Sequence, residues 1–204
     1  MTLSFRPLRA LSAALALSLS AGCTLATPDA PEEAPLEIVT RWDHRPEAPI
    51  WNAAMIDATR NGARALVETV PADIDTFCPG YAEAEPIARK AFWAGLFSGL
   101  ARFESGWRPE ASGAGGRFRG LLQISPATAR HHGCDLSASA GLYDGATNLR
   151  CAARIAANAV ERDGVVVGGS GAWGGVARDW PPMRNARKRA EIAEFTRALP
   201  ACQQ

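Results

Sequence analysis

The segment from Pro86 to Glu104 most constrains the fold, because a helix over these residues is apolar around most of its circumference. One stripe of this helix consists of Ile87, Ala91, Ala94, Phe97, Ala101 and Glu104, and Phe92, Leu96, Leu100 and Phe103 lie beside it. A helix with so little polar surface must be buried among other elements. Pro86 suits the first helical position, and Gly106 and Pro109 stop the helix. We therefore predict a central helix that ends at Glu104.

Apolar residues at helical spacing also occur on both sides of this central segment. The further predicted helices cover residues 47–70 (interrupted by Gly62), 126–132, 147–162 and 183–199. Between them, residues 111–124 suggest a small irregular hairpin, and residues 164–175 are too rich in glycine to predict a helix. The pattern predicts a mainly α fold in a single domain.

The composition separates this domain from the start of the chain. Overall, 47% of residues are hydrophobic and 21% are charged, as in ordinary globular proteins. Residues 1–22 contain two arginines, a short apolar run and then small residues, which is typical of a secretory signal. Residues 23–36 are rich in Pro, Ala and acidic residues and predict a flexible tether, so the domain would occupy residues 37–204. Removing residues 1–22 takes away two arginines and no acid, which leaves 20 basic against 21 acidic side chains. This balance gives no indication of a nucleic-acid partner.

Cys23 comes directly after the predicted signal. Ala21-Gly22-Cys23 resembles the end of a bacterial lipobox, in which the cysteine is lipidated before cleavage, although Ser20 stands where a large aliphatic residue is usual. Ordinary cleavage beside an incidental cysteine is the alternative. Thr24 follows Cys23 in place of the Asp that marks inner-membrane retention in many bacteria. We therefore expect a periplasmic protein held by a lipid anchor on the outer membrane of a Gram-negative bacterium.

Four cysteines follow the tether, and an even number in an exported chain favours disulfides. Of the three possible connectivities, we favour Cys134–Cys151, which closes a short loop, with Cys78–Cys202 tying back the end of the chain. A metal site is the competing interpretation. The chain has no C-x-x-C pair, however, and His131-His132 does not have the spacing of a zinc site. We expect neither a metal nor a cofactor.

Glu104 is the ionisable residue at the end of the apolar helix. Desolvation raises the pKa of a carboxyl in such surroundings, and the negative end of the helix dipole acts in the same direction. A carboxyl that stays protonated near neutral pH can serve as a general acid. The alternative, from composition alone, is a glutamate that points into solvent at the helix end.

The residues around Glu104 resemble the lytic transglycosylase (SLT) family, which shares the lysozyme-like fold. The resemblance lies in Phe-Glu-Ser-Gly-Trp at 103–107, in Gly-Leu-Leu-Gln-Ile-Ser-Pro-Ala-Thr-Ala at 120–129, and in Asn148 before a further helix. It covers about residues 88–190, and residues 37–85 carry no motif of the family. Trp173 and Gly174 depart from the family, which has Tyr and Asn in the corresponding motif.

The resemblance implies that Glu104 cleaves the β-1,4 bond between N-acetylmuramic acid and N-acetylglucosamine in peptidoglycan and leaves a 1,6-anhydromuramyl end. Ser105 beside the acid, Gln123 as a polar residue in an apolar run and Trp173 as a residue that can stack on a sugar ring are candidate substrate contacts. Ser105 could instead cap the helix, and Gln123 could satisfy backbone groups. Trp107 is either a sugar-stacking or a core residue.

Two other functions remain open from the sequence. One is hydrolysis by the same fold, as in a goose-type lysozyme. The other is a non-catalytic lipoprotein that binds peptidoglycan, which the Trp173-Gly174 departure suggests. No Asp or Glu lies between residues 111 and 134, where a lysozyme-type second carboxylate might be sought, and Asp135 and Asp144 are expected at the surface or at helix caps.

Overall fold

The computed structural model describes residue 2, residues 37–168 and residues 171–203. Apart from residue 2, the predicted signal (1–22) lies outside these residues, as do the predicted tether (23–36) and Cys23. The α-helices are α1 (Ala48–Ala58), α2 (Ala65–Glu68), α3 (Pro86–Glu104), α4 (Pro126–His131), α5 (Gly145–Asp163) and α6 (Ala186–Arg197). The 3-10 turns are η1 (Ile74–Thr76), η2 (Ala114–Gly116), η3 (Gly141–Tyr143), η4 (Gly175–Arg178), η5 (Pro181–Arg184) and η6 (Pro200–Cys202). Of the helices described, none is long and apolar enough to cross a membrane.

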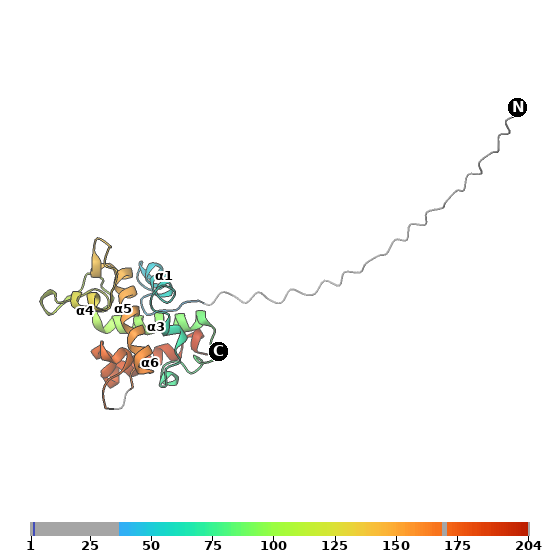
Figure 1. Cartoon of the computed structure of the whole chain (residues 1–204). Helices are drawn as coiled ribbons and strands as arrows, with labels where there is room; N and C mark the ends of the chain where they lie inside the picture. Colours follow the sequence, from blue (N-terminus) through green and yellow to red (C-terminus); the bar gives the residue numbers. More distant parts are fainter. Residues whose placement is uncertain (1, 3–36, 169–170, 204) are drawn as a thin grey trace. The chain divides into compact units, whose positions relative to one another are not determined.

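Helix α3 is the centre of the domain, as its sequence predicts. It packs against α1, α2 and α6, and Figure 1 shows α1 and α6 on opposite sides of it. Every residue from Ala91 to Ala101 is buried. Ile87 is an exception within the predicted inward stripe, because its side chain is 43% exposed at the first turn. The core therefore closes around the middle of α3, and Glu104 emerges at its end.

The only β-structure in the described residues is a small antiparallel hairpin. Strand β1 (Ser112–Gly113) pairs with β2 (Phe118–Arg119), and an isolated bridge joins Arg119 to Ile124. This arrangement confirms the irregular hairpin predicted over residues 111–124. The bridge folds the segment 120–124 back along β2, and Leu121 and Leu122 of this segment are buried in the core.

The predicted last helix, residues 183–199, is wrong in its extent. Met183 belongs to η5, and α6 begins only after Asn185, whose side chain accepts a hydrogen bond from the backbone of Lys188 at 3.0 Å. An asparagine in the extended conformation that caps the following turn starts a new helix. The break changes the direction of the chain before α6 packs on α3.

The segment before α3, which carries no family motif, contributes to the same core. Trp42 and Trp51 pack edge to face with ring centroids 5.6 Å apart, and both are buried. Arg89 at the start of α3 donates hydrogen bonds to backbone carbonyls of Val67, Tyr81, Ala82 and Ala84. These bonds satisfy carbonyls in the irregular connection and fix it against α3.

Both disulfides have the connectivity favoured from the sequence. Cys134, which follows α4, is bonded to Cys151 in α5, and Cys78 is bonded to Cys202 in η6. The second bond holds the end of the chain beside the connection that leads to α3. Two disulfides of this kind belong to a protein of an oxidising compartment outside the cytoplasm.

Candidate active site

Glu104 is the last residue of α3 and is mostly, but not completely, buried. Desolvation raises the pKa of its carboxyl to about 7, and the positive charge of Lys188 opposes this shift. No hydrogen bond to the Glu104 carboxyl is found among the described residues, so loss of water is not offset by a donor. The carboxyl therefore holds a proton near neutral pH and can exchange it with a ligand.

The chain turns sharply directly after Glu104. Gly106 and Trp107 have φ values of +61° and +60°, and positive φ is unusual for a bulky residue such as tryptophan. Trp107 is held there by a 2.8 Å hydrogen bond from its Nε1 to the Ser98 carbonyl and by an edge-to-face contact with His44. These contacts place Trp107 as a structural support of the turn. The turn fixes where α3 stops and hence where the Glu104 carboxyl lies.

Ser105 is buried, and its hydroxyl is used within the same turn. Its Oγ donates to the Ala101 carbonyl at 3.2 Å and accepts a hydrogen bond from the Arg108 N–H at 3.3 Å. These bonds correspond to the helix-capping alternative that the sequence left open. Contact between Ser105 and a substrate stays a prediction.

Asn148 fixes the segment 120–124 beside the core. It is fully buried in the first turn of α5. Its Oδ1 accepts from the Leu122 N–H at 2.8 Å, and its Nδ2 donates to the Arg119 and Leu142 carbonyls at 2.9 Å each. Gly120 is required at this point, because a Cβ there would lie 2.1 Å from the Leu142 carbonyl oxygen. The family element at Asn148 is thus a buried connector.

Gln123 lies in this segment with a positive φ of +49°. Its Nε2 donates to the carbonyls of Ala111 and Gly120, at 3.2 and 2.9 Å. Its Oε1 lies over Gly113, where a Cβ would be only 2.4 Å away. The amide nitrogen of Gln123 thus satisfies backbone carbonyls, which is the alternative to substrate contact that the sequence left open. The side chain is half-buried and therefore stays partly accessible. Substrate binding by Gln123 stays a prediction.

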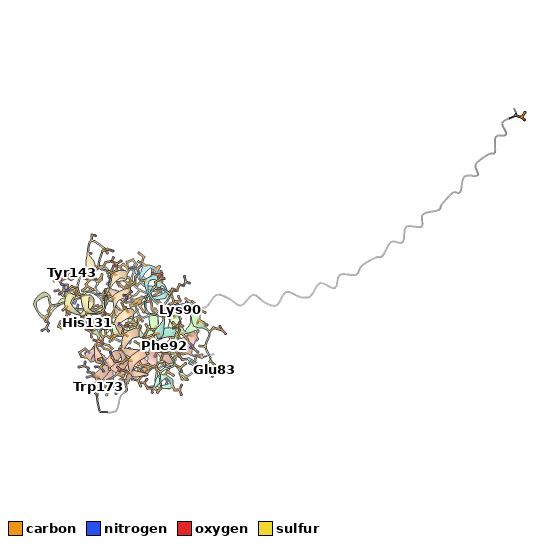
Figure 2. The ribbon with its side chains drawn as sticks, viewed as in Figure 1. Glu83, Lys90, Phe92, His131, Tyr143 and Trp173 are labelled. Carbon is orange, nitrogen blue, oxygen red and sulfur yellow. A yellow bond between two sulfur atoms is a disulfide. The ribbon has the colours of Figure 1, made fainter. Side chains whose placement is uncertain are left out.

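Trp173 is 44% exposed, and the Cζ of Arg189 lies 5.7 Å from the centroid of its ring. Figure 2 shows Trp173 at the edge of the domain. Carboxylates anchor the chain on both sides of the glycine-rich stretch that precedes it. Asp73 accepts hydrogen bonds from the N–H groups of residues 166–168, at 2.6 to 2.9 Å, and Asp163 accepts one from Gly175. An exposed indole on an anchored segment is available for stacking against a sugar ring.

Three residues near the site were not anticipated from the sequence. Lys188 of α6 acts on Glu104, as its effect on the carboxyl pKa shows. Arg189 contacts Trp173, and Trp180 donates from Nε1 to the Leu122 carbonyl at 3.0 Å while packing on Phe97. A run of cations early in α6 was the available signal, but only the tertiary fold shows that Lys188 of this run acts on Glu104.

The residues expected to be uninvolved lie apart from these contacts. Asp144 is the N-cap of α5 and accepts from the Thr147 N–H, and Asp135 accepts from the Ser137 N–H at the surface. His131 and His132 pack edge to face, and His132 bonds to the exposed Asn158. Among the described residues, no group of three or more His, Cys, Asp and Glu side chains could hold a metal ion.

The fold and these motifs can be compared with known proteins. The sequence profile of the transglycosylase SLT domain matches residues 82–165, which include Glu104, Gln123 and Asn148. A solved structure of a variant of the Bdellovibrio protein Bd0314 DslA is 31% identical in sequence, with a TM-score of 0.74, and the match covers 81% of this chain and 98% of that chain. The chain belongs to the SLT transglycosylase domain family. The wild-type DslA structure matches at 30% identity and a TM-score of 0.72, over 81% of this chain and 98% of that one. A search of curated protein sequences found no match.

Membership in the SLT family establishes the lysozyme-like fold and the general class of chemistry. SLT domains belong to glycoside-cleaving enzymes of the lysozyme-like superfamily, and their substrate is peptidoglycan. The profile ends at residue 165, so Trp173 and Lys188 lie beyond it. The DslA match extends over most of the domain and therefore includes more than the SLT profile does.

Proposed function

We propose that this protein is a peptidoglycan lytic transglycosylase in which Glu104 acts first as the acid and then as the base. The observation that carries the proposal is the Glu104 carboxyl itself. It is mostly buried at the end of α3, and its pKa is raised to about 7. A carboxyl with this pKa can give and take back a proton at neutral pH.

The reaction needs one carboxyl. Protonated Glu104 donates its proton to the glycosidic oxygen between N-acetylmuramic acid and N-acetylglucosamine as the C1–O bond breaks. Positive charge develops at C1 of the muramyl residue. The C6 hydroxyl of the same residue attacks C1 and gives its proton to the Glu104 carboxylate. The products are a 1,6-anhydromuramyl end and a free sugar hydroxyl, and no water is consumed.

The sequence favours this scheme over a two-carboxylate mechanism. Inverting and retaining glycosidases place two carboxyl groups about 5 to 9.5 Å apart. No Asp or Glu lies between residues 111 and 134, where such a second carboxylate might be sought. A single carboxyl matches the intramolecular attack by the C6 hydroxyl.

Hydrolysis is the second candidate, and the Trp173-Gly174 pair favours it. Where the family has Tyr and Asn, this chain presents an indole with one N–H donor and no acceptor, next to a glycine. A changed hydrogen-bond pattern at this point could admit water to C1 in place of the C6 hydroxyl. Glu104 would remain the acid in either case.

Digestion of purified sacculi in water enriched in heavy oxygen separates the two reactions. Transglycosylation yields anhydro ends that contain no solvent oxygen, whereas hydrolysis yields reducing ends that contain it. Mass spectrometry of the products reads both. Reducing ends that carry heavy oxygen, without anhydro ends, would exclude the transglycosylase mechanism.

A Glu104→Gln variant tests whether the protein is an enzyme or a non-catalytic binder. The substitution keeps the shape of the side chain and removes the titrating proton. Glu110→Gln is the matched control, because Glu110 is exposed and lies six residues further along. We expect Glu104→Gln to lose at least a hundredfold in the rate of sacculus digestion, with the control unchanged. Equal digestion by all three proteins would show that Glu104 is not the acid.

The lipid anchor is a separate proposal that depends on Cys23. The two disulfides support an extracytoplasmic location for the domain. Lipidation of Cys23 would hold it at the periplasmic face of the outer membrane, close to its substrate. Labelling of expressing cells with a radioactive fatty acid tests this, with Cys23→Ala as the control. Absence of label in the wild type would contradict it.

A further inference from the structure

The first turn of α6 carries a run of cationic residues, one of which acts on the candidate acid Glu104. Arg187, Lys188 and Arg189 are consecutive, and among the described residues none of them lies within ion-pairing distance of a carboxylate. The nearby Glu191 is already shared by Arg41 and Arg102. Glu191 is therefore paired with Arg41 and Arg102, and the Lys188 ammonium can bind an anionic ligand.

Lys188 is held in place beside the acid. Its Nζ lies 5.2 Å from the centroid of the Phe103 ring, and Phe103 directly precedes Glu104. An ammonium over an aromatic face is attracted by the ring but keeps its N–H donors for another partner. Lys188 is half-buried, so its stem is supported while its head stays accessible.

A second pair of the same kind extends this edge. The Cζ of Arg189 lies 5.7 Å from the centroid of the Trp173 ring, and its Nη1 donates to the Met183 carbonyl at 2.9 Å. Lys188 with Phe103 and Arg189 with Trp173 make up what we call the basic–aromatic edge. The whole chain has a formal charge of only +1, so this concentration of cations is local.

The chemistry of this edge fits an anionic sugar polymer. Sugar rings stack on aromatic faces, and an ammonium donates hydrogen bonds to carboxylates. In peptidoglycan, muramyl residues carry an O-lactyl arm that ends in a carboxylate when free and leads to peptide carboxylates when substituted. Polymers of N-acetylglucosamine alone carry neither. A cation beside the acid would therefore distinguish a muramyl residue from an N-acetylglucosaminyl residue.

We infer that Lys188 binds a carboxylate carried on the lactyl arm of a muramyl residue and so selects muramyl-containing glycan at the Glu104 site. This inference rests on the proposed function, because it assigns a part of the same substrate. It concerns binding and selectivity, whereas the proposed function concerns the bond that Glu104 cleaves.

Binding by the full mature chain tests the inference, with Glu104→Gln in every protein so that no ligand is consumed. The ligands are soluble glycan strands with peptides, the same strands after removal of the peptides by an amidase, and a neutral chito-oligosaccharide. The variant is Lys188→Met, which keeps the length of the side chain. Lys90→Met is the matched control, because Lys90 lies near the other end of α3, roughly 21 Å along the helix axis.

We expect Lys188→Met to weaken binding of muramyl-containing strands roughly tenfold, as for loss of one charge-assisted contact. Binding of the chito-oligosaccharide should not change, Lys90→Met should bind all ligands like the parent, and Lys188→Arg should restore binding. A loss confined to the peptide-free strands identifies the lactyl carboxylate, and one confined to the peptide-bearing strands identifies a peptide carboxylate.

Two results would overturn the inference. One is unchanged binding of both kinds of strand by Lys188→Met, and the other is an equal loss on the neutral oligosaccharide. Circular dichroism of each variant checks that it folds. These outcomes differ from failure of the proposed function, which would appear as equal digestion of sacculi by the wild type and Glu104→Gln, whatever Lys188 does.

Discussion

At the scale of single residues, burial of Glu104 couples its proton to the stability of the fold. Its pKa rises from about 4.5 in an exposed chain to about 7 in the folded one. Between these values the folded protein binds a proton that the unfolded chain has released, so stability falls as the pH rises through this window. At about 1.4 kcal/mol per pKa unit, the loss is about 3 kcal/mol once the pH exceeds the folded-state pKa.

Replacement of Glu104 by glutamine removes this loss. We expect Glu104→Gln to gain about 3 kcal/mol of unfolding free energy relative to the wild type between pH ~4 and pH ~8.5. Urea denaturation of both proteins at the two pH values measures the difference. If the difference between variant and wild type is the same at both pH values, Glu104 does not titrate between them.

We expect Lys188 to lower the pH at which activity falls. A mechanism that starts with protonated Glu104 slows as the pH rises through the pKa of about 7. The positive charge of Lys188 lowers this pKa, so Lys188→Met should move the fall in kcat/KM to higher pH. The pH profile on soluble glycan strands measures the midpoint, which does not depend on the height of the curve. Lys90→Met should leave the midpoint in place, and a downward move in Lys188→Met would contradict the assignment.

At the scale of elements, one buried side chain joins α5 to the hairpin. The Asn148 side chain makes three hydrogen bonds, to the backbone groups of Arg119, Leu122 and Leu142. Its replacement leaves buried backbone groups without partners, at about 1 to 3 kcal/mol each. We expect Asn148→Ala to lower the free energy of unfolding by about 3 kcal/mol or more and to speed amide hydrogen exchange over residues 119–124.

The exposed Asn158 on the same helix provides the control. Its side chain bonds only to His132 at the surface among the described residues, so Asn158→Ala should cost under about 1 kcal/mol. Asn148→Asp is a more conservative test, because it keeps an acceptor for the Leu122 N–H but loses both donors. Equal stability of Asn148→Ala and Asn158→Ala would contradict the connector role.

Elements defined by local pattern could be predicted from the sequence, and those defined by packing could not. The apolar circumference of α3 and the stop signals Gly106 and Pro109 are local, so the position and end of this helix were predictable. The separation of η5 from α6 depends on the N-cap at Asn185. Apolar residues at helical spacing continue across Asn185 in the sequence, so the spacing alone predicted one longer helix. Lys188 and Trp180 could not be assigned, because their partners Glu104 and Leu122 lie more than 50 residues away.

At the scale of the whole molecule, the region without family motifs helps to position the site. Asp73 caps the chain at residues 166–168, which leads to Trp173, and Trp42 and Trp51 fill the core beside α3. The Thr196 hydroxyl donates to the Phe77 carbonyl at 2.8 Å, close to the Cys78–Cys202 bond. The first and last parts of the domain are therefore fastened to each other, with α3 between them.

This arrangement predicts that the two disulfides contribute unequally to the free energy of unfolding. Cys78–Cys202 spans 124 residues and Cys134–Cys151 spans 17. If a disulfide stabilises by restricting the unfolded chain, these spans correspond to about 5 and about 3 kcal/mol. We expect the double variant Cys78→Ala/Cys202→Ala to lose about 2 kcal/mol more unfolding free energy than Cys134→Ala/Cys151→Ala.

Urea denaturation of the two double variants and the wild type measures these losses, and each pair serves as the control for the other. Both pairs connect segments of the same core, so a difference between them reports chiefly the length of chain that each bond closes. A larger loss from the Cys134–Cys151 pair would contradict the chain-entropy explanation. It would mean that the short bond stabilises mainly through the junction of α4 and α5, and hence through the support that α5 gives to the hairpin at Asn148.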